Sequence, residues 1–272
     1  MTGVGLIGCG AIGRRIAAAV QAGEAGDAGL VAVFDQDADM ARALSTSVSP
    51  GLHHTDDFDA FLSSDGLDLV LECASPAAAE AYAARVLTAG KDLVLMSSGA
   101  LTDRRLFKRL SDLAISNGSR MMVPSGAIGG IDAVRAVRHQ LDEVSLTTTK
   151  PPKGLTGAPG FADWESVAIE EPTVVFEGPA LEAVQLFPAN VNVSATLSLA
   201  GLGPELTRVR VVADPSATQN VHEVVATGSF GSLTFTMKLE PDPDNPRTSG
   251  LAISSAIETL RAACSSGPRI GT

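Results

Sequence analysis

The sequence predicts an α/β protein that starts with a doubly wound parallel sheet and continues into a second α+β domain built on a mostly antiparallel sheet. Three features of the 272 residues support this prediction. Short apolar runs alternate with helical patterns in the first half, a glycine-rich turn joins the first run to the first helix, and runs of period-two alternation follow after about residue 140. We place the first domain at 1–135 and the second at 136–247. A helix at about 248–272 is expected to pack back on the first domain.

The first half contains five candidate strands, each a short and nearly continuous apolar run. They are residues 3–8, 29–35, 67–74, 91–98 and 120–125. The helix after the first run carries apolar residues on one face, namely Ile12, Ile16, Ala19 and Val20. A second helix opens at Ser75-Pro76, a capping residue followed by proline, and a third after Thr102 carries Leu106, Leu110, Leu113 and Ala114 on one side. Apolar strands separated by helices indicate a parallel sheet that is covered on both faces.

The second half changes to strands with one apolar face. Residues 232–239 place Leu233, Phe235, Met237 and Leu239 on one side, and residues 207–212 alternate similarly. Both read as antiparallel strands, and "GSFGSL" before the last of them reads as a hairpin. The final helix is expected from the spacing of Leu251, Ile257 and Leu260.

Composition narrows the function classes. The chain is 45% hydrophobic and has a net charge of −11, so it has material for a buried core and no basic patch for nucleic acid or an anionic membrane. It lacks a signal-peptide pattern and any apolar run long enough to span a membrane, and we expect a cytoplasmic protein. Three widely spaced cysteines, Cys9, Cys73 and Cys264, suit neither a disulfide framework nor a metal site, and free thiols are expected.

The glycine-rich turn predicts a dinucleotide site. Gly8, Gly10 and Gly13 form G-x-G-x-x-G after a strand, with Ala11 and Ile12 opening the helix. Asp35 ends the next apolar run, where a carboxylate accepts hydrogen bonds from an adenosine ribose and repels a 2′-phosphate. This predicts a Rossmann-type domain that prefers NAD. NADP stays possible, since the guanidinium of Arg14 or Arg15 near the 2′ position could accommodate phosphate.

Other polar residues have two interpretations each. His53 and His54 resemble a surface loop into a helix rather than a metal site, and His139 ends a helical pattern where it interacts with the helix dipole. Lys150, beside two prolines, is either an exposed lysine or a partner for a substrate carboxylate. Asn190 and Asn192 either cap the helix that follows or bind a ligand.

The sequence also resembles the L-aspartate dehydrogenase family over nearly its whole length. The resemblance rests on "GLIGCGAIG", "ECASP", "LVLMSSGAL", "PSGAIGGIDA", "TTTKPPKGL", "FPANVNVSATLSLAG" and "DPSATQNVHEV", in that order. It implies an NAD(P)-dependent oxidoreductase that converts L-aspartate to iminoaspartate, and then to oxaloacetate and ammonia, or runs the reverse reaction. In some organisms this family supplies iminoaspartate for NAD biosynthesis.

The resemblance also implies residue roles. Ala74 and Ser75 would contact the cofactor, Ala127 would border the nicotinamide through its backbone, and Asn192 would hydrogen-bond cofactor or substrate. His222 would be the catalytic acid/base. In "VHEVVATG" it shares a face with Val224 and Ala226, and a purely structural histidine is the alternative.

Two other functions fit the same sequence. One is a related reductase of the dihydrodipicolinate reductase or homoserine dehydrogenase type. A dihydrodipicolinate reductase would carry an adjacent-histidine and lysine signature in its substrate domain, whereas His53 and His54 lie in the cofactor half. The other is a sensor that binds NAD(H) without turnover. His222 argues against it, because a sensor has no need of a proton-transfer group. An exposed antiparallel sheet face favours a homodimer.

Overall fold

The structure is a computed structural model that describes residues 1–188, 192–240 and 249–267. Internal contacts divide it into two compact units. The first comprises Met1–Pro124 together with Ile253 and the described residues after it, and the second runs from Ser125 to Ala252. Residues 125–135, which the sequence-based boundary assigns to the first domain, make their contacts within the second unit. Each unit is described here by itself.

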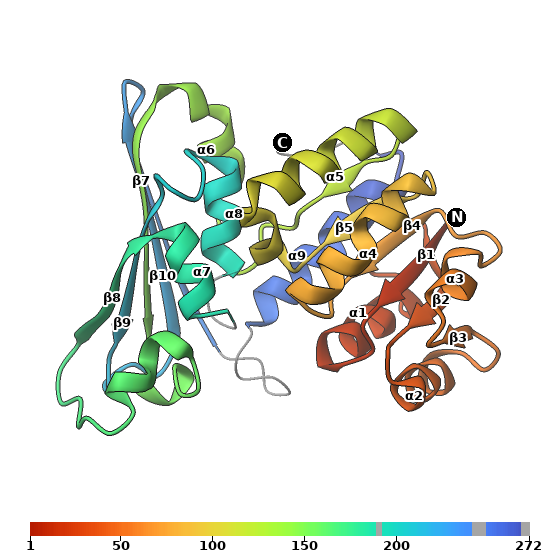
Figure 1. Ribbon diagram of the computed structural model, residues 1–272, viewed down its shortest axis with the longest axis horizontal. Coiled ribbons are helices and arrows are strands. Elements are labelled where there is room, and N and C mark those ends of the chain that lie inside the picture. The colour runs from red at the N-terminus through yellow and green to blue at the C-terminus, as the bar shows by residue number, and fades with distance from the viewer. Residues whose placement is uncertain (189–191, 241–248, 268–272) are drawn as a thin grey trace. The chain divides into compact units, whose positions relative to one another are not determined.

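The first unit is built on six strands that pair in parallel, in the order β3-β2-β1-β4-β5-β6. The strands are β1 Thr2–Ile7, β2 Ala28–Phe34, β3 His53–Thr55, β4 Leu69–Glu72, β5 Asp92–Leu95 and β6 Met121–Met122 (Figure 1). The strand order reverses between β1 and β4, as in doubly wound nucleotide-binding sheets. The predicted parallel sheet is therefore confirmed.

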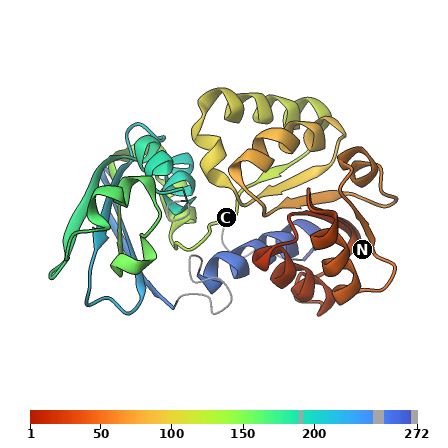
Figure 2. The same cartoon turned by 60° about the horizontal axis from the view of Figure 1, so that its bottom comes forward.

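Helices cover both faces of this sheet. They are α1 Ala11–Gln21, α2 Ala38–Val48, α3 Phe58–Leu62, α4 Pro76–Thr88, α5 Arg104–Asn117 and α9 Gly250–Cys264, with a 3-10 turn at Ser98–Thr102. One face packs Val4, Leu6 and Leu71 against α1, α2 and α9. On the other face the ring of Phe34 contacts Phe61 of α3 and Tyr82 of α4. Figure 2 shows the sheet between these two helix layers.

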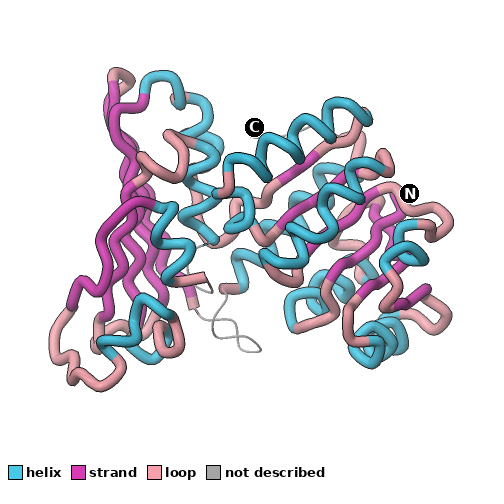
Figure 3. Tube along the Cα trace, viewed as in Figure 1, coloured by secondary structure: helices cyan, strands magenta, loops and turns pink. Residues whose placement is uncertain are grey.

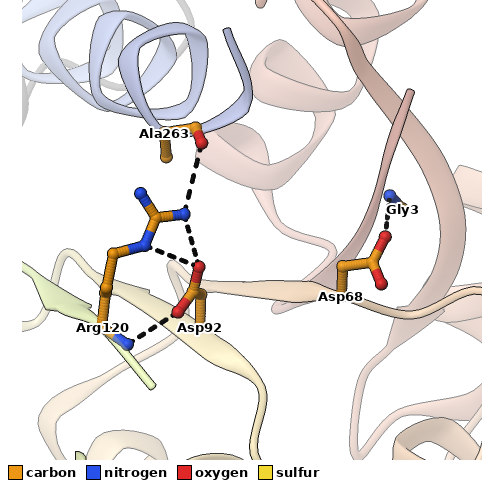
Figure 4. A network of polar contacts seen from close by, with 5 residues as sticks. All are labelled: Gly3, Asp68, Asp92, Arg120 and Ala263. Atoms are coloured by element: carbon orange, nitrogen blue, oxygen red, sulfur yellow. Dashed lines mark hydrogen bonds and ion pairs between the residues drawn. The ribbon is translucent and has the colours of Figure 1, made fainter. Parts of the chain in front are cut away.

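A polar network fixes the last helix to this unit. The Arg120 guanidinium donates to Asp92 Oδ2 through Nε at 2.9 Å and to the Ala263 carbonyl of α9 through Nη2 at 3.3 Å (Figure 4). Nearby, Asp68 Oδ2 accepts the Gly3 N–H at 2.9 Å. Leu260 of α9 is fully buried, whereas Leu251, one of the residues used to predict this helix, is exposed.

The second unit is a five-stranded mixed sheet in the order β11-β10-β7-β9-β8. Its strands are β7 Leu141–Lys150, β8 Thr173–Pro179, β9 Arg208–Ala213, β10 Asn220–Gly228 and β11 Gly231–Leu239. The predicted hairpin is present as β10 and β11. One prediction is wrong in detail: β9, expected to be antiparallel throughout, pairs in parallel with β7 and antiparallel only with β8. The three pairings other than that of β7 with β9 are antiparallel.

The helices of this unit lie on one face of its sheet (Figure 3). They are α6 Ile131–Ala136, α7 Ala180–Leu186 and α8 Asn192–Ala200, with 3-10 turns at Arg138–Gln140, Pro152–Gly154 and Pro159–Trp164. Val144, Leu146 and Val224 pack against Leu197 of α8. On the opposite face, the exposed side chains include Arg208, Arg210, Glu223, Thr234, Thr236 and Lys238.

Two sequence-based expectations need correction or completion. His53 and His54 lie in the edge strand β3 rather than in a loop, because backbone pairing with β2 forms a short strand even where no apolar alternation marks it. Strands β7 and β8 were not anticipated. Within the described part of the chain, no helix has the length and apolarity needed to cross a membrane.

Candidate functional site

The glycine loop after β1 has the geometry of a nucleotide cradle. Gly8 has φ of +102°, and a Cβ there would lie 2.9 Å from Ala74 Cα. A Cβ on Gly13 would lie 2.0 Å from the Gly8 carbonyl oxygen, so both positions require glycine for the packing of the loop. Gly10 differs, since a Cβ there would meet nothing within 4 Å. Space therefore remains beside Gly10, at the N-terminus of α1, where a pyrophosphate would fit.

Asp35 stands directly after β2 and is tied to the glycine loop. Its Oδ2 accepts the Cys9 N–H at 2.8 Å and its Oδ1 accepts the Asp37 N–H at 3.0 Å. The side chain is half-buried. Because a carboxylate oxygen has two lone pairs, each oxygen can accept one further hydrogen bond, which is what a ribose diol offers. The residues present thus fit the adenosine end of a dinucleotide.

A buried carboxyl, Glu72, organises the neighbouring loop and was missed by the sequence analysis. Its Oε1 accepts the N–H groups of Ala74 and Ser75 at 2.8 and 3.0 Å. Ser97 donates to it as well, through its hydroxyl at 2.8 Å and its N–H at 3.0 Å. Burial raises the pKa of Glu72, while these hydrogen bonds act in the opposite direction. The sequence signal that could have identified Glu72 is its position as a carboxyl residue at the end of an apolar strand.

Ser75 caps the next helix. Its Oγ accepts the Ala78 N–H at 3.1 Å, so α4 begins where the sequence predicts. The loop at Ala74 is exposed and lies against Gly8. The first unit therefore brings together the glycine loop, with Ala11 and Ile12 in the first turn of α1, and the residues that follow β2 and β4.

In the second unit, His222 is buried on β10, with only 4% of its surface exposed. Its Nδ1 lies 3.1 Å from the Thr148 hydroxyl of β7, the residue directly opposite. Burial, and secondarily the charge of Lys150, lower the pKa of His222 to about 4. The imidazole therefore does not keep its ordinary pKa, because burial penalises the charged ring.

Lys150 is buried as well, at the end of β7, with 4% exposure. The interpretation as an ordinary exposed lysine is therefore wrong. Burial lowers the pKa of its ammonium to about 8. Two groups that carry positive charge when protonated are thus both buried, and the charge of Lys150 disfavours the charged form of His222.

The loop after residue 124 packs beside the histidine strand. The Gly129 N–H lies 3.5 Å from the sulfur of Met237, which stands directly opposite His222 on β11. A Cβ on Gly126, where φ is +70°, would lie 3.8 Å from Val193 of α8. Ala127 belongs to the hydrophobic core cluster that also contains Val193 and Val224. The second unit therefore gathers the loop, the start of α8 and the histidine strand in one region.

The asparagines and the remaining histidines are placed as follows. Asn192 is the first residue of α8 and is exposed, whereas Asn190 lies outside the described residues. His53 Nδ1 contacts Ser64 Oγ at 2.8 Å, and His139 contacts Arg138 in an exposed 3-10 turn. The part of the chain that the structure describes contains no group of three or more His, Cys, Asp or Glu suited to hold a metal ion.

Both parts of the chain match models of known protein families. Residues 8–124 match the family model "Homoserine dehydrogenase, NAD binding domain", and residues 132–263 match "Aspartate dehydrogenase, C-terminal". An L-aspartate dehydrogenase of Nitrosopumilus maritimus is 43% identical over the whole of both chains. One from Methanosarcina barkeri is 44% identical over 96% of each chain.

The chain belongs to the L-aspartate dehydrogenase family. A crystal structure of aspartate dehydrogenase from Thermotoga maritima has the same fold, with a TM-score of 0.78, 29% identity and 99% of each chain covered. A homoserine dehydrogenase of Thiobacillus denitrificans, at 16% identity and a TM-score of 0.59, shares the fold alone. The family resemblance found in the sequence is thereby confirmed, and the first unit is an NAD-binding domain.

Proposed function

We propose that this protein oxidises L-aspartate to iminoaspartate with NAD, or runs the reverse reductive amination, with His222 as the acid/base. The observation that carries the proposal is a buried histidine, fixed by Thr148 and beside Lys150, in a unit that matches the aspartate dehydrogenase C-terminal model. The names of the relatives support L-aspartate as the substrate.

The arrangement of His222 suits proton transfer. Because Nδ1 contacts the Thr148 hydroxyl, the proposal assigns the proton transfer to Nε2. The lowered pKa keeps the imidazole neutral near pH 7, which is the form that accepts a proton. His222 takes a proton from the water that adds to the imine carbon of iminoaspartate and returns it to the imine nitrogen, which gives a carbinolamine. It then transfers the hydroxyl proton of the carbinolamine to the nitrogen, so that the C–N bond breaks, ammonia leaves and the carbonyl of oxaloacetate forms. Bound NAD supplies the hydride acceptor for the α-carbon.

The cofactor-binding residues of this proposal are the following. Gly8, Gly10, Ala11, Ile12 and Gly13 hold the pyrophosphate, and Asp35 holds the ribose diol and disfavours NADP. The loop residues Ala74 and Ser75 line the same edge of the sheet. The proposal also assigns contacts with the nicotinamide or the substrate to the backbone of Ala127 and the side chain of Asn192.

Three further assignments belong to the proposal. The helix-free face of the second sheet, defined by the exposed residues of β9, β10 and β11, pairs with the same face of a second copy in a homodimer. Free cysteines fit a cytoplasmic location, where thiols stay reduced. The iminoaspartate formed feeds NAD biosynthesis. Light scattering of the purified protein tests the dimer: a monomeric mass contradicts it.

The test of the activity is absorbance at 340 nm with a panel of substrates. L-aspartate with NAD, or oxaloacetate with ammonia and NADH, should turn over. L-glutamate should be much poorer because its extra methylene displaces the distal carboxylate. Turnover of homoserine or dihydrodipicolinate instead would favour a related reductase. NADH binding without turnover of any of these would favour a sensor.

A further inference from the structure

The inner face of the second sheet changes from apolar to polar at one level. Along β7, Val144 and Leu146 are buried among apolar residues, and Thr148 and Lys150 follow on the same face. Along β10, Val224 stands opposite Leu146 and His222 stands opposite Thr148. Asn220, also buried, comes next on that face. The switch is therefore in register on two adjacent strands, which makes a defined polar end on a buried face.

The groups at this polar end suit an anion. The buried polar side chains of the second unit that the structure describes are hydroxyls, an amide, the His222 imidazole and the Lys150 ammonium, and they include no carboxylate. An anionic ligand would lower the cost of keeping an ammonium buried here.

The backbone at Lys150 is held in place. Lys150 pairs with Ala213 of β9, and its carbonyl accepts the Asp214 N–H at 2.9 Å. Pro151 follows and restricts the chain further. The long side chain therefore starts from a fixed point on a strand, and such points position a ligand-binding group more accurately than a loop does.

Lys150 and the residue that contacts His222 stand at different levels of β7. Thr148, which contacts His222, lies two residues before Lys150 on the same face, and two residues of strand span about 6.6 Å. The α-carboxylate of an amino acid is one bond from the carbon that reacts, whereas the side-chain carboxylate of aspartate lies further away. If His222 acts at the α-carbon, as the proposed function holds, the cation two residues further along the strand matches the more distant group.

We propose that Lys150 binds the side-chain carboxylate of the substrate and so selects dicarboxylic substrates over monocarboxylic ones. This inference rests on the proposed function for the role of His222. It gives the buried lysine a task that burial alone does not explain, because an apolar residue would fill the same volume without the cost of desolvating an ammonium.

The test compares two carboxylates that do not react, succinate and butyrate, by calorimetry with NADH present. Lys150→Met should weaken succinate binding by roughly 30- to 1,000-fold, the range for removing one partner of a desolvated charge pair, and change butyrate binding by less than about 3-fold. The KM for L-aspartate should rise by a similar factor, with a smaller change in kcat. Lys153→Met, an exposed lysine in the same segment, is the matched control and should match wild type.

Unchanged succinate binding in Lys150→Met overturns the inference, and so does an equal loss for succinate and butyrate, which marks a structural lysine. Lys150→Gln serves as a second neutral variant if the first does not fold. Wild-type protein gives a further reading: succinate affinity should fall above about pH 8, where Lys150 loses its proton and His222 is already neutral, while butyrate affinity stays level. A level succinate affinity counts against the inference.

The two proposals fail separately. Succinate binding that depends on Lys150, without turnover of L-aspartate, removes the proposed function and retains the carboxylate site. Turnover of L-aspartate with succinate binding that does not depend on Lys150 retains the proposed function and removes the carboxylate site.

Discussion

The two units each bury titratable side chains, but they stabilise them differently. Glu72 in the first unit accepts four hydrogen bonds from its own chain, and these oppose the rise in its pKa that burial causes. For His222 in the second unit, burial and the nearby charge of Lys150 lower the pKa in the same direction. The chain itself therefore compensates the buried charge of Glu72, and the hydrogen bonds around Glu72 hold the loops that follow β4 and β5.

At His222 both causes act against the protonated ring, and pKa values perturbed in this way are frequent at functional sites. Substrate carboxylates would supply negative charge beside Lys150 and His222 and raise both pKa values. Buried charge alone therefore does not mark a catalytic group. The direction in which the surrounding groups act on its pKa is more informative.

Removing the imidazole is expected to give the largest effect. His222→Ala should lower turnover of L-aspartate by roughly 10²- to 10⁴-fold, the range for loss of one general acid/base, and leave NADH binding nearly intact. Steady-state rates together with fluorescence titration of NADH measure both quantities. Near-normal turnover would make His222 a structural residue and remove the contrast between the clusters.

Removing the buried carboxylate should act on stability instead. Glu72→Ala leaves the N–H groups of Ala74, Ser75 and Ser97 without their acceptor, and we expect a loss of about 3 kcal/mol or more in the free energy of unfolding. Glu72→Gln retains the acceptor at Oε1 and should lose less. Urea denaturation measures the order wild type, Gln variant, Ala variant; equal stability of all three would contradict the role assigned to these bonds.

The ribose contact should give an intermediate effect, confined to the cofactor. Asp35→Ala removes the acceptor and the charge that repels a 2′-phosphate, so the KM for NAD should rise about 10-fold and the relative use of NADP should improve. Asp35→Asn retains one acceptor oxygen without the charge and should shift the preference with a smaller loss for NAD. Michaelis constants for both cofactors that stay unchanged would reject the assignment.

The smallest expected effect is on stability as a function of pH. The pKa of Lys150 is lowered to about 8, so between pH 8 and its ordinary value of 10.5 the unfolded chain binds more protons than the folded one. Wild-type stability therefore gains a contribution as the pH rises through this window, and Lys150→Met should lack it. Denaturation midpoints at pH 8 and 10 give the difference. An identical pH dependence in both proteins would show that the lysine is not desolvated.

The same substitution should also move the pH profile of catalysis. Without the nearby ammonium, the pKa of His222 rises toward its ordinary value, because the remaining neighbours on the adjacent strands, Thr148 and Met237, carry no charge. The acid limb of kcat/KM, which reports the free enzyme, should shift to higher pH. A shift to lower pH, or none, would mean that Lys150 does not act on His222.

Local features of the sequence determined most of the first sheet and the hairpin of the second. The glycine spacing, the apolar strands and the Ser75-Pro76 cap are short-range patterns, and the structure contains the strand, turn and helix they predict. The hairpin and the face that His222 shares with Val224 followed from period-two alternation. Such patterns suffice where one segment's own residues fix its backbone and its buried side.

The tertiary structure decided what the buried polar residues do. In the sequence, Lys150 looks like an exposed lysine between threonines and prolines, and Glu72 like the end of a strand; both are buried because segments far away in the chain cover them. The strand β3 depends on pairing with β2, and the parallel pairing of β7 and β9 depends on strand order. Burial, register and pKa are properties of long-range neighbours, which no short window of sequence contains.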